Sequence, residues 1–278
     1  MAPKKDKFSA VWVSHSSMGD FLKCPRGYYL KNMYKDPKTG RKICTVSPAL
    51  ALGQAVHNTV EPLVKFPAES RMKQPLLDIF EKEWKQVSGL QGGFESPEEE
   101  ADAKARGRAM IERIIANPKP LEQKAIRLKD ELPSYFLSEE ENIILCGKVD
   151  WIMYEPKDDS IHILDFKTGK NEESDDSLQL PIYLLLLTTL QKRKVTGASY
   201  WYLDRDDEPI VKELPTKEES LARVMEVALK VKKAREDVSF VCPRGERGCF
   251  CCQPFEKIIK GEAKYVGIGG YNRDMYLA

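Results

Sequence analysis

The sequence predicts an α/β protein, because strand-like and helix-like segments alternate along most of the chain. Apolar, β-prone segments at residues 143–154, 161–165 and 195–204 are typical of strands. Segments 48–61, 97–117 and 216–234 instead have helix start signals or the three-to-four residue spacing of helices. The 278 residues, 42% of them hydrophobic, are enough for one large domain or for a core with a small helical lobe.

The most informative strand ends in Asp165-Phe166-Lys167-Thr168-Gly169-Lys170. Residues i and i+2 of a strand point to the same face, so Asp165 and Lys167 are expected to project together. A carboxylate can hold a divalent cation, and an ammonium beside it can orient water or neutralise a phosphate. Taken alone, so short a motif fits a surface ion pair better, and its neighbours decide between the two interpretations.

A second strand is predicted over residues 143–154, with Asp150 in its middle. A lone carboxylate in an apolar strand is costly to desolvate unless it is paired or bound to metal. Residues 155–160 have the composition of a turn, so the two strands are expected to form a hairpin. The hairpin can bring Asp150 and Asp165 together, and converging carboxylates suit a hard cation.

Two predicted helices carry further candidate residues. Ser47 and Pro48 start a helix on which Gly53, His57 and Glu61 share a face. His57 is either a cation ligand or a core histidine bonded to Glu61, and the second interpretation is better when the helix is considered alone. Residues 175–191 form a buried helix in which Gln179 and Tyr183 lie one turn apart, either near a site or on the helix rim.

Cysteines suggest a second metal site. Of seven, four fall within residues 242–252, namely Cys242, Cys249, Cys251 and Cys252. Without a secretory signal, this density favours metal ligation over disulfides. Cys24 lies on a predicted helix over residues 16–31, where a buried, unreactive thiol is the alternative.

Four motifs together, in this order, resemble the RecB-like nucleases of the PD-(D/E)XK superfamily, which include the AddB nuclease domain and CRISPR adaptation exonuclease subunits. They are Gly53-Gln54-Ala55-Val56-His57, Gly147-Lys148-Val149-Asp150, Asp165-Phe166-Lys167-Thr168-Gly169-Lys170 and Gln179-Leu180-Pro181-Ile182-Tyr183. The resemblance covers roughly residues 15–255. It implies a restriction-endonuclease-like core with a central mixed β-sheet flanked by helices.

We therefore expect one nuclease domain over residues 1–278, with a helical insertion at about 68–118 and a Cys-rich segment at about 240–255. The resemblance implies Mg²⁺ or Mn²⁺ held by Asp150, Asp165, the Phe166 carbonyl and His57. Lys167 would then stabilise the transition state, with Gln179 and Tyr183 positioning it or contacting DNA.

A subset of the family holds a [4Fe-4S] cluster, with one cysteine before the histidine motif and three near the C-terminus. Cys24, Cys242, Cys249 and Cys252 are the ligands this implies, and zinc is the alternative metal. The C-terminal spacing departs from the family pattern, so the choice between Cys251 and Cys252 stays open. We favour Cys252, because it forms a C-x-x-C pair with Cys249.

The expected function is a metal-dependent deoxyribonuclease, an exonuclease of DNA recombination, repair or phage and CRISPR DNA processing. Its substrate would be single-stranded DNA or duplex ends. No helicase motif occurs, so unwinding would need a helicase or another recombination or adaptation protein as partner. We expect a cytoplasmic protein without a membrane segment.

Two alternatives remain. One is a non-catalytic nucleic-acid-binding scaffold subunit that keeps the fold, against which the intact Asp150, Asp165 and Lys167 argue. The other is a zinc-ribbon-like interaction protein, which leaves the acidic strands unexplained. The net charge of +1 means that any nucleic-acid surface must be a local patch.

Overall fold

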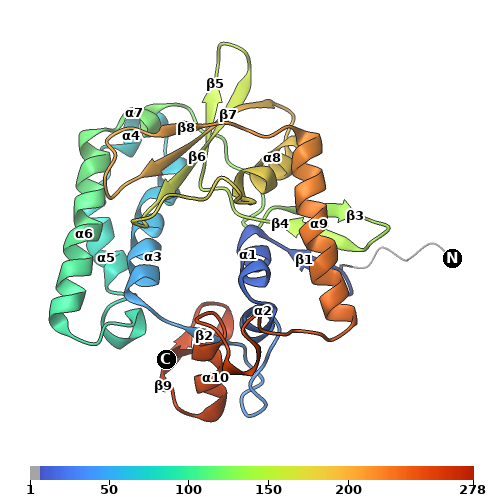
Figure 1. Cartoon of the computed structure of the whole chain (residues 1–278). Helices are drawn as coiled ribbons and strands as arrows, with labels where there is room; N and C mark the ends of the chain where they lie inside the picture. The colour runs from blue at the N-terminus through green and yellow to red at the C-terminus, as the bar shows by residue number, and fades with distance from the viewer. Residues whose placement is uncertain (1–6) are drawn as a thin grey trace. The chain divides into compact units, whose positions relative to one another are not determined.

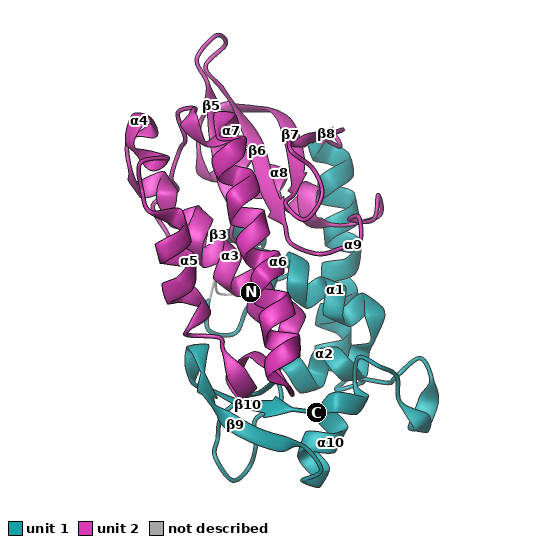
Figure 2. Ribbon diagram, turned by 90° about the vertical axis from the view of Figure 1, so that its left-hand side faces the viewer, with its two compact units in different colours: residues 1–46, 134–147, 217–278 teal, residues 47–133, 148–216 magenta. Residues whose placement is uncertain are grey.

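The computed structural model describes residues 7–278, which form two compact units (Figure 2). Unit 1 comprises residues 1–46, 134–147 and 217–278, of which the first six are not described, and unit 2 comprises residues 47–133 and 148–216. Strands and helices occur in both, which confirms the α/β class. Whether the chain folds as one domain stays a prediction.

Unit 2 is built on a mixed four-stranded sheet with the order β5-β6-β7-β8. Its strands are β5 (Trp151–Glu155), β6 (Ser160–Lys167), β7 (Lys194–Tyr202) and β8 (Ile210–Lys212). β5 and β6 form the predicted antiparallel hairpin, and β6 runs parallel to β7. The crossover between β6 and β7 contains a helix, α8, as parallel neighbours require.

Helices pack against this sheet. The bounds are α3 (Pro48–Val60), α4 (Ala68–Arg71), α5 (Leu76–Trp84), α6 (Pro97–Ala116), α7 (Lys119–Glu122) and α8 (Gln179–Leu190), with short 3₁₀ turns η1 (Glu61–Lys65) and η2 (Gly89–Gly92). Figure 1 shows α3, α5 and α6 side by side. Their apolar residues share one core with Trp151, Phe166 and Trp201 of the sheet. Helices thus fill the segment predicted as a helical insertion.

The start of α3 follows from its sequence. Ser47 is extended and its hydroxyl accepts the N–H of Leu50, while Pro48 occupies the first turn, where it costs no hydrogen bond. The helix therefore begins as predicted, and this places His57 in its last turn.

Unit 1 contains two three-stranded mixed sheets, with the orders β1-β4-β3 and β2-β10-β9. Its strands are β1 (Val11–Val13), β2 (Ile43–Thr45), β3 (Ser134–Ser138), β4 (Ile143–Cys146), β9 (Lys264–Gly269) and β10 (Arg273–Leu277). Its helices are α1 (His15–Lys23), α2 (Pro25–Asn32), α9 (Lys217–Glu236) and α10 (Gln253–Lys260), with 3₁₀ turns η3 (Gly245–Arg247) and η4 (Gly270–Asn272). The strands of the chain thus fall into three sheets.

The strand predicted over residues 143–154 is two strands, which corrects the placement of Asp150 in mid-strand. β4 ends at Cys146 and pairs with β1 and β3, whereas β5 begins at Trp151 and pairs with β6. Gly147 has no side chain to pack and weakens a strand at this point. Asp150 therefore lies just before β5, where its carboxylate accepts the backbone N–H of Phe166 at 3.1 Å.

Two other local predictions are wrong. The helix predicted over residues 16–31 is split at Cys24, because the residue before a proline avoids the helical region. Cys24 ends α1 and caps α2, with its sulfur accepting the N–H of Gly27 at 3.2 Å. Gly267, Gly269 and Gly270 predict an irregular C-terminal stretch, because glycine weakens strands, but this stretch forms β9 and β10, which pair antiparallel.

Among the described residues, no helix combines the length and the apolar character that a membrane-crossing segment needs.

We predict that Gly107→Ala in α6 lowers the free energy of unfolding, although alanine favours helices. An added Cβ would lie 2.8 Å from the Phe80 ring, which is fully buried, so the ring or the helix would have to shift within the packed core. Overpacking of this kind costs about 1–3 kcal/mol, more than the helix-propensity gain of about 1 kcal/mol. Urea titration followed by circular dichroism measures the change.

Gly19→Ala in α1 is the matched control, because a Cβ there meets no atom within 4 Å. It should raise the free energy of unfolding by about 0.5–1 kcal/mol. Equal stabilisation by both substitutions would contradict the close packing of α6 on Phe80.

Candidate active site and cysteine cluster

Asp165 and Lys167 lie on the same face of β6, as predicted, and both contact α8. The Asp165 carboxylate is buried and accepts hydrogen bonds from Gln179 Nε2 at 2.8 Å and from the Tyr183 hydroxyl at 3.1 Å. Its other oxygen pairs with Lys167 Nζ at 2.9 Å. Helix α8 thus brings Gln179 and Tyr183 of one sequence motif to Asp165 and Lys167 of another.

Lys167 is held as an ammonium group by several partners. Besides Asp165, its Nζ contacts Glu173 Oε2 at 3.3 Å and Gln179 Oε1, and it lies 4.6 Å from the centre of the Tyr200 ring. Burial disfavours the charged form, but the carboxylates of Asp165 and Glu173 outweigh this effect and raise the pKa of Lys167. The side chain is therefore a fixed positive charge at the end of β6.

A second cluster forms where α3 ends and β5 begins. His57 Nδ1 lies 2.9 Å from Glu61 Oε1 and 3.5 Å from Asp150 Oδ2, and the Lys148 ammonium pairs with Glu61. Burial disfavours the imidazolium form, yet Glu61 and Asp150 raise the pKa of His57. The hydrogen bond between His57 and Glu61 is the one considered for a core histidine, and Asp150 is an additional neighbour.

These three residues have the donor set of a hard-cation site. One ligand atom from each of His57, Glu61 and Asp150 lies within 4.8 Å of the others. Burial, and then the negative charge of Asp165, raises the pKa of Asp150 well above its usual value. A bound divalent cation would offset this repulsion, so the residues fit a magnesium or manganese ion.

The ligand set expected from sequence is brought together only in part. His57 and Asp150 belong to the group of three, whereas Asp165 is outside it, engaged with Lys167, Gln179 and Tyr183. Phe166 donates its backbone N–H to Asp150, and its ring packs between Trp151 and Trp201.

Several neighbours of these residues were not singled out as site residues by the sequence: Glu61, Lys148, Glu173 and Tyr200. The i, i+4 spacing of His57 and Glu61 predicts the hydrogen bond between them, but it does not indicate that Glu61 lies at a candidate metal site. Glu173 and Tyr200 reach Lys167 from a loop and from β7, and no local pattern indicates either contact.

Gly53, one turn before His57, has a specific steric role. A Cβ at this position would lie 3.2 Å from Thr168 Oγ1, tighter than an ordinary contact. The Thr168 carbonyl also accepts a hydrogen bond from Arg106 of α6 at 3.0 Å. The loop that follows Lys167 is therefore seated on α3 and α6, with glycine providing the room.

The four cysteines expected as ligands come together in unit 1. The sulfurs of Cys24, Cys242, Cys249 and Cys252 all lie within 4.8 Å of one another, all four residues are buried, and none is in a disulfide. Burial opposes ionisation of Cys249, but backbone N–H groups of Cys251 and Cys252 and the neighbouring thiols lower its pKa to about 6. A buried set of four thiols with one ionised so readily fits a thiolate-bound metal.

Cys251 is not part of this group. Its backbone lies against Gly27, where an added Cβ would be 3.1 Å from the Cys251 carbonyl oxygen. This close approach of α2 to the segment 249–252 sets the orientation of the cysteine loop. Of the two open possibilities, the structure places Cys252 with the other three.

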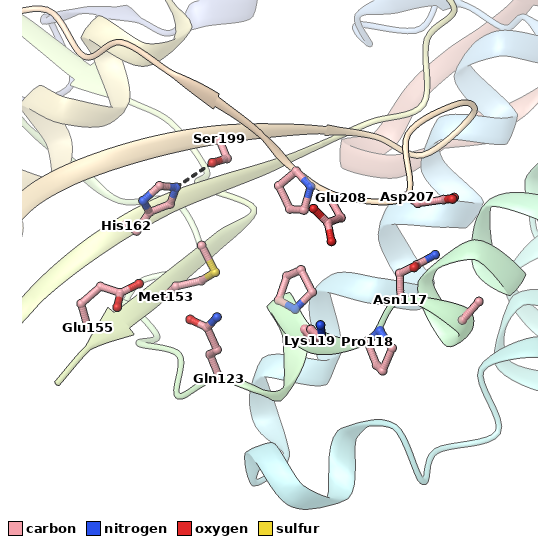
Figure 3. Close-up of a pocket in the computed structure, with 13 residues that line it drawn as sticks. Asn117, Pro118, Lys119, Gln123, Met153, Glu155, His162, Ser199, Asp207 and Glu208 are labelled. Carbon is pink, nitrogen blue, oxygen red and sulfur yellow. Dashed lines mark hydrogen bonds between the residues drawn. The ribbon is translucent and has the colours of Figure 1, made fainter. Parts of the chain in front are cut away.

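A separate cavity in unit 2, of about 460 Å³, contains none of the expected site residues (Figure 3). His162 and Ser199 lie on its wall and share a hydrogen bond of 2.8 Å, and Met153 lies beside them. Burial lowers the pKa of His162. The predicted chemistry at the end of β6 therefore does not depend on this cavity.

Carboxylates clustered beside a fixed lysine suit the metal-assisted hydrolysis of phosphodiester bonds. A family model described as the PD-(D/E)XK nuclease superfamily matches residues 12–254. The chain therefore belongs to this superfamily, whose nucleases use divalent metal ions. None of the curated proteins compared with the chain matches it in sequence.

We predict that Cys24→Ser lowers the metal content of the purified protein and makes unit 1 sensitive to protease. Cys24 is the one ligand outside the C-terminal segment, so a bound metal would tie the N-terminal helices to that segment. Iron and zinc counts by mass spectrometry, with limited proteolysis, measure both effects.

Cys251→Ser is the matched control, because this thiol is outside the cluster, and it should keep metal content and protease resistance. If Cys24→Ser retained its metal while Cys251→Ser lost it, the site would be a local knuckle of the C-terminal segment.

Proposed function

We propose that this protein is a metal-dependent deoxyribonuclease that hydrolyses phosphodiester bonds, acting as an exonuclease on single-stranded DNA or duplex ends. The observation that carries the proposal is the placement of Asp165 and Lys167 on one face of β6, with Gln179 of α8 bonded to both. A scaffold that had lost catalysis would have no need to keep a partly buried ammonium in this position.

Mg²⁺ or Mn²⁺ would be held by His57, Asp150 and Asp165 with the Phe166 carbonyl, and Glu61 is a further candidate ligand or orienting group. When bound, the ion supplies Lewis-acid activation of the scissile phosphate and of the attacking water. Asp165 would join the ligands by releasing Lys167, which keeps Glu173 and Gln179 as partners.

Lys167 would stabilise the negative charge that develops on the phosphate in the transition state. Gln179 accepts from Lys167 and donates to Asp165, so it fixes the distance between the two groups. Tyr183 donates to Asp165 and is hydrogen-bonded by Gln179 at 3.0 Å. Gln179 and Tyr183 are therefore positioning residues for the carboxylate and the lysine.

The four cysteines would hold a metal with a structural role. Four tetrahedral thiolates around a zinc ion at about 2.3 Å lie about 3.8 Å apart. The Cys249 and Cys252 sulfurs are 3.9 Å apart, and all four lie within 4.8 Å, which supports a single ion. A [4Fe-4S] cluster, favoured from sequence, places iron and sulfide between the thiolates and needs a wider ring.

The proposed function also includes a biological process and a partner protein. DNA recombination, repair or phage and CRISPR DNA processing are the processes in which an exonuclease of this kind acts. A helicase or another recombination or adaptation protein would supply unwinding, since the sequence holds no helicase motif.

We predict that Asp165→Asn and Lys167→Met each reduce cleavage of labelled DNA in Mn²⁺ by at least about 100-fold. Both substitutions keep side-chain volume, because deletion of the buried Asp165 would leave Gln179 and Tyr183 without an acceptor. Titration calorimetry should show weaker Mn²⁺ binding for Asp165→Asn and nearly unchanged binding for Lys167→Met.

Lys194→Met on β7 and Asp159→Asn in the hairpin turn are matched controls, since both residues are exposed and lie in the same sheet region. Wild-type cleavage by Lys167→Met would sink the nuclease assignment of this site. No cleavage by the wild-type protein, with Mn²⁺ bound normally, would favour the scaffold alternative.

We predict that His57→Ala and Glu61→Gln weaken Mn²⁺ binding and that His57→Ala changes the relative activity with Mg²⁺ and Mn²⁺. Imidazole suits manganese better than magnesium, and Glu61 holds the ring through Nδ1. Loss of an orienting neighbour costs about 10- to 100-fold in metal affinity. If His57 serves only the core, the melting temperature will fall while the metal preference stays unchanged.

A further inference from the structure

Unit 1 contains a cavity of about 760 Å³ at the end of α10, between β9, β10 and the loop that precedes β2. Figure 2 shows β9, β10 and α10 in the same part of unit 1. The volume is within the range of about 300–1,000 Å³ typical of ligand pockets. Neither the carboxylate–lysine site nor any cysteine lines it.

The lining combines aromatic rings with cationic groups. Three tyrosines and three basic residues contribute: Tyr34, Tyr265, Tyr276, Lys38, Arg41 and Lys260. Tyr265 is half exposed and meets Tyr276 edge to face, with ring centres 5.4 Å apart. Aromatic faces beside cations are the elements with which proteins bind single-stranded nucleic acid, by base stacking and phosphate contact.

The two carboxylates on the wall are already engaged. Asp274 is fully buried and accepts from Thr39 Oγ1 at 2.6 Å and from Arg41 Nε at 2.8 Å. Asp36 accepts the backbone N–H of Lys38 at 2.7 Å, which closes the turn of the loop. Because the ion pair with Asp274 uses only Nε of Arg41, it fixes the guanidinium and leaves its terminal amino groups for an anion.

The cavity is built on the cysteine cluster. Ile43 and Ile258 of its wall are buried in the same hydrophobic cluster as Cys24, Cys242, Cys249 and Cys252, and Tyr34 and Tyr276 pack against that cluster. α10 begins directly after Cys252 and ends at Lys260, on the cavity wall. The cysteine segment therefore sets the start of α10, which carries Lys260, and Tyr34 and Tyr276 pack on the same cluster.

We propose that this cavity binds single-stranded DNA, with a base stacked on Tyr265 and the backbone phosphates contacted by Lys260, Lys38 and Arg41. The inference rests on the proposed nuclease function and adds a strand-binding site outside the catalytic residues. A free nucleotide offers the same base and phosphate, so the test separates a strand from a mononucleotide.

Binding is measured without cleavage, using fluorescein-labelled oligothymidylate and the full chain carrying Lys167→Met, with no chelator and no added Mg²⁺ or Mn²⁺, by fluorescence anisotropy. Tyr265→Ala should weaken binding about 5- to 100-fold, and Tyr265→Phe should keep it, since the ring is the binding element. Lys260→Gln should weaken binding and reduce the slope of log affinity against log salt by about 0.7, the value for one phosphate contact.

Tyr271→Ala and Lys264→Gln are matched controls. Both residues are exposed in unit 1, and neither lines the cavity. They should bind oligothymidylate as the parent does, and circular dichroism should confirm that all variants are folded. Thymidine monophosphate should compete only at concentrations far above those of the oligonucleotide.

Three results would overturn the inference. If Tyr265→Ala and Lys260→Gln both bind oligothymidylate as tightly as the controls, the strand lies elsewhere, and the proposed nuclease function stands without this site. Equal competition by thymidine monophosphate would assign the cavity to free nucleotides. A wild-type protein that neither binds oligothymidylate nor cleaves DNA would overturn the nuclease function as well.

Discussion

The polar contacts between β6 and α8 in unit 2 depend on one buried carboxylate, that of Asp165. A charge removed from water needs compensation by hydrogen bonds and an opposite charge. Asp165 obtains both from Lys167, Gln179 and Tyr183, and this requirement determines where α8 must lie after β6. The apolar body of α8 provides burial, while Gln179 and Tyr183, in its first two turns, provide the polar groups that compensate the buried charge.

Asp150 also needs compensation for its charge, because it lies close enough to Asp165 for the two carboxylates to repel each other. Asp150 accepts the Phe166 N–H and faces His57, so its negative charge is partly balanced, but the charge of Asp165 still raises its pKa. Residual repulsion of this kind destabilises the metal-free arrangement and is relieved by a cation. A divalent ion bound beside Asp150 would relieve this repulsion, which is the physical basis of the metal site proposed above.

The sequence could predict those features that local patterns contain. The β5–β6 hairpin follows from a turn between two apolar runs, and the pairing of Asp165 with Lys167 follows from strand alternation. The break after Cys146 could not be read from residues 143–154, because apolar composition does not indicate which partner strand each half joins. β10 pairs with β2 between Asp274 and Ile43, residues far apart in the chain, and no periodicity encodes that partner. The contacts of Glu173 and Tyr200 with Lys167 could not be predicted for the same reason, because these residues come together only when the chain folds.

Unit 1 is assembled from three separate stretches of chain, and its cysteine cluster joins Cys24 to residues 242–252. During synthesis on the ribosome, α1 and α2 emerge more than 200 residues before their cysteine partners. Cys24 and the apolar residues around it therefore lack their C-terminal partners while all of unit 2 is translated. A metal held by all four cysteines would enter only after residue 252 has left the exit tunnel, so its supply at that moment would set the yield of the metal-bound protein.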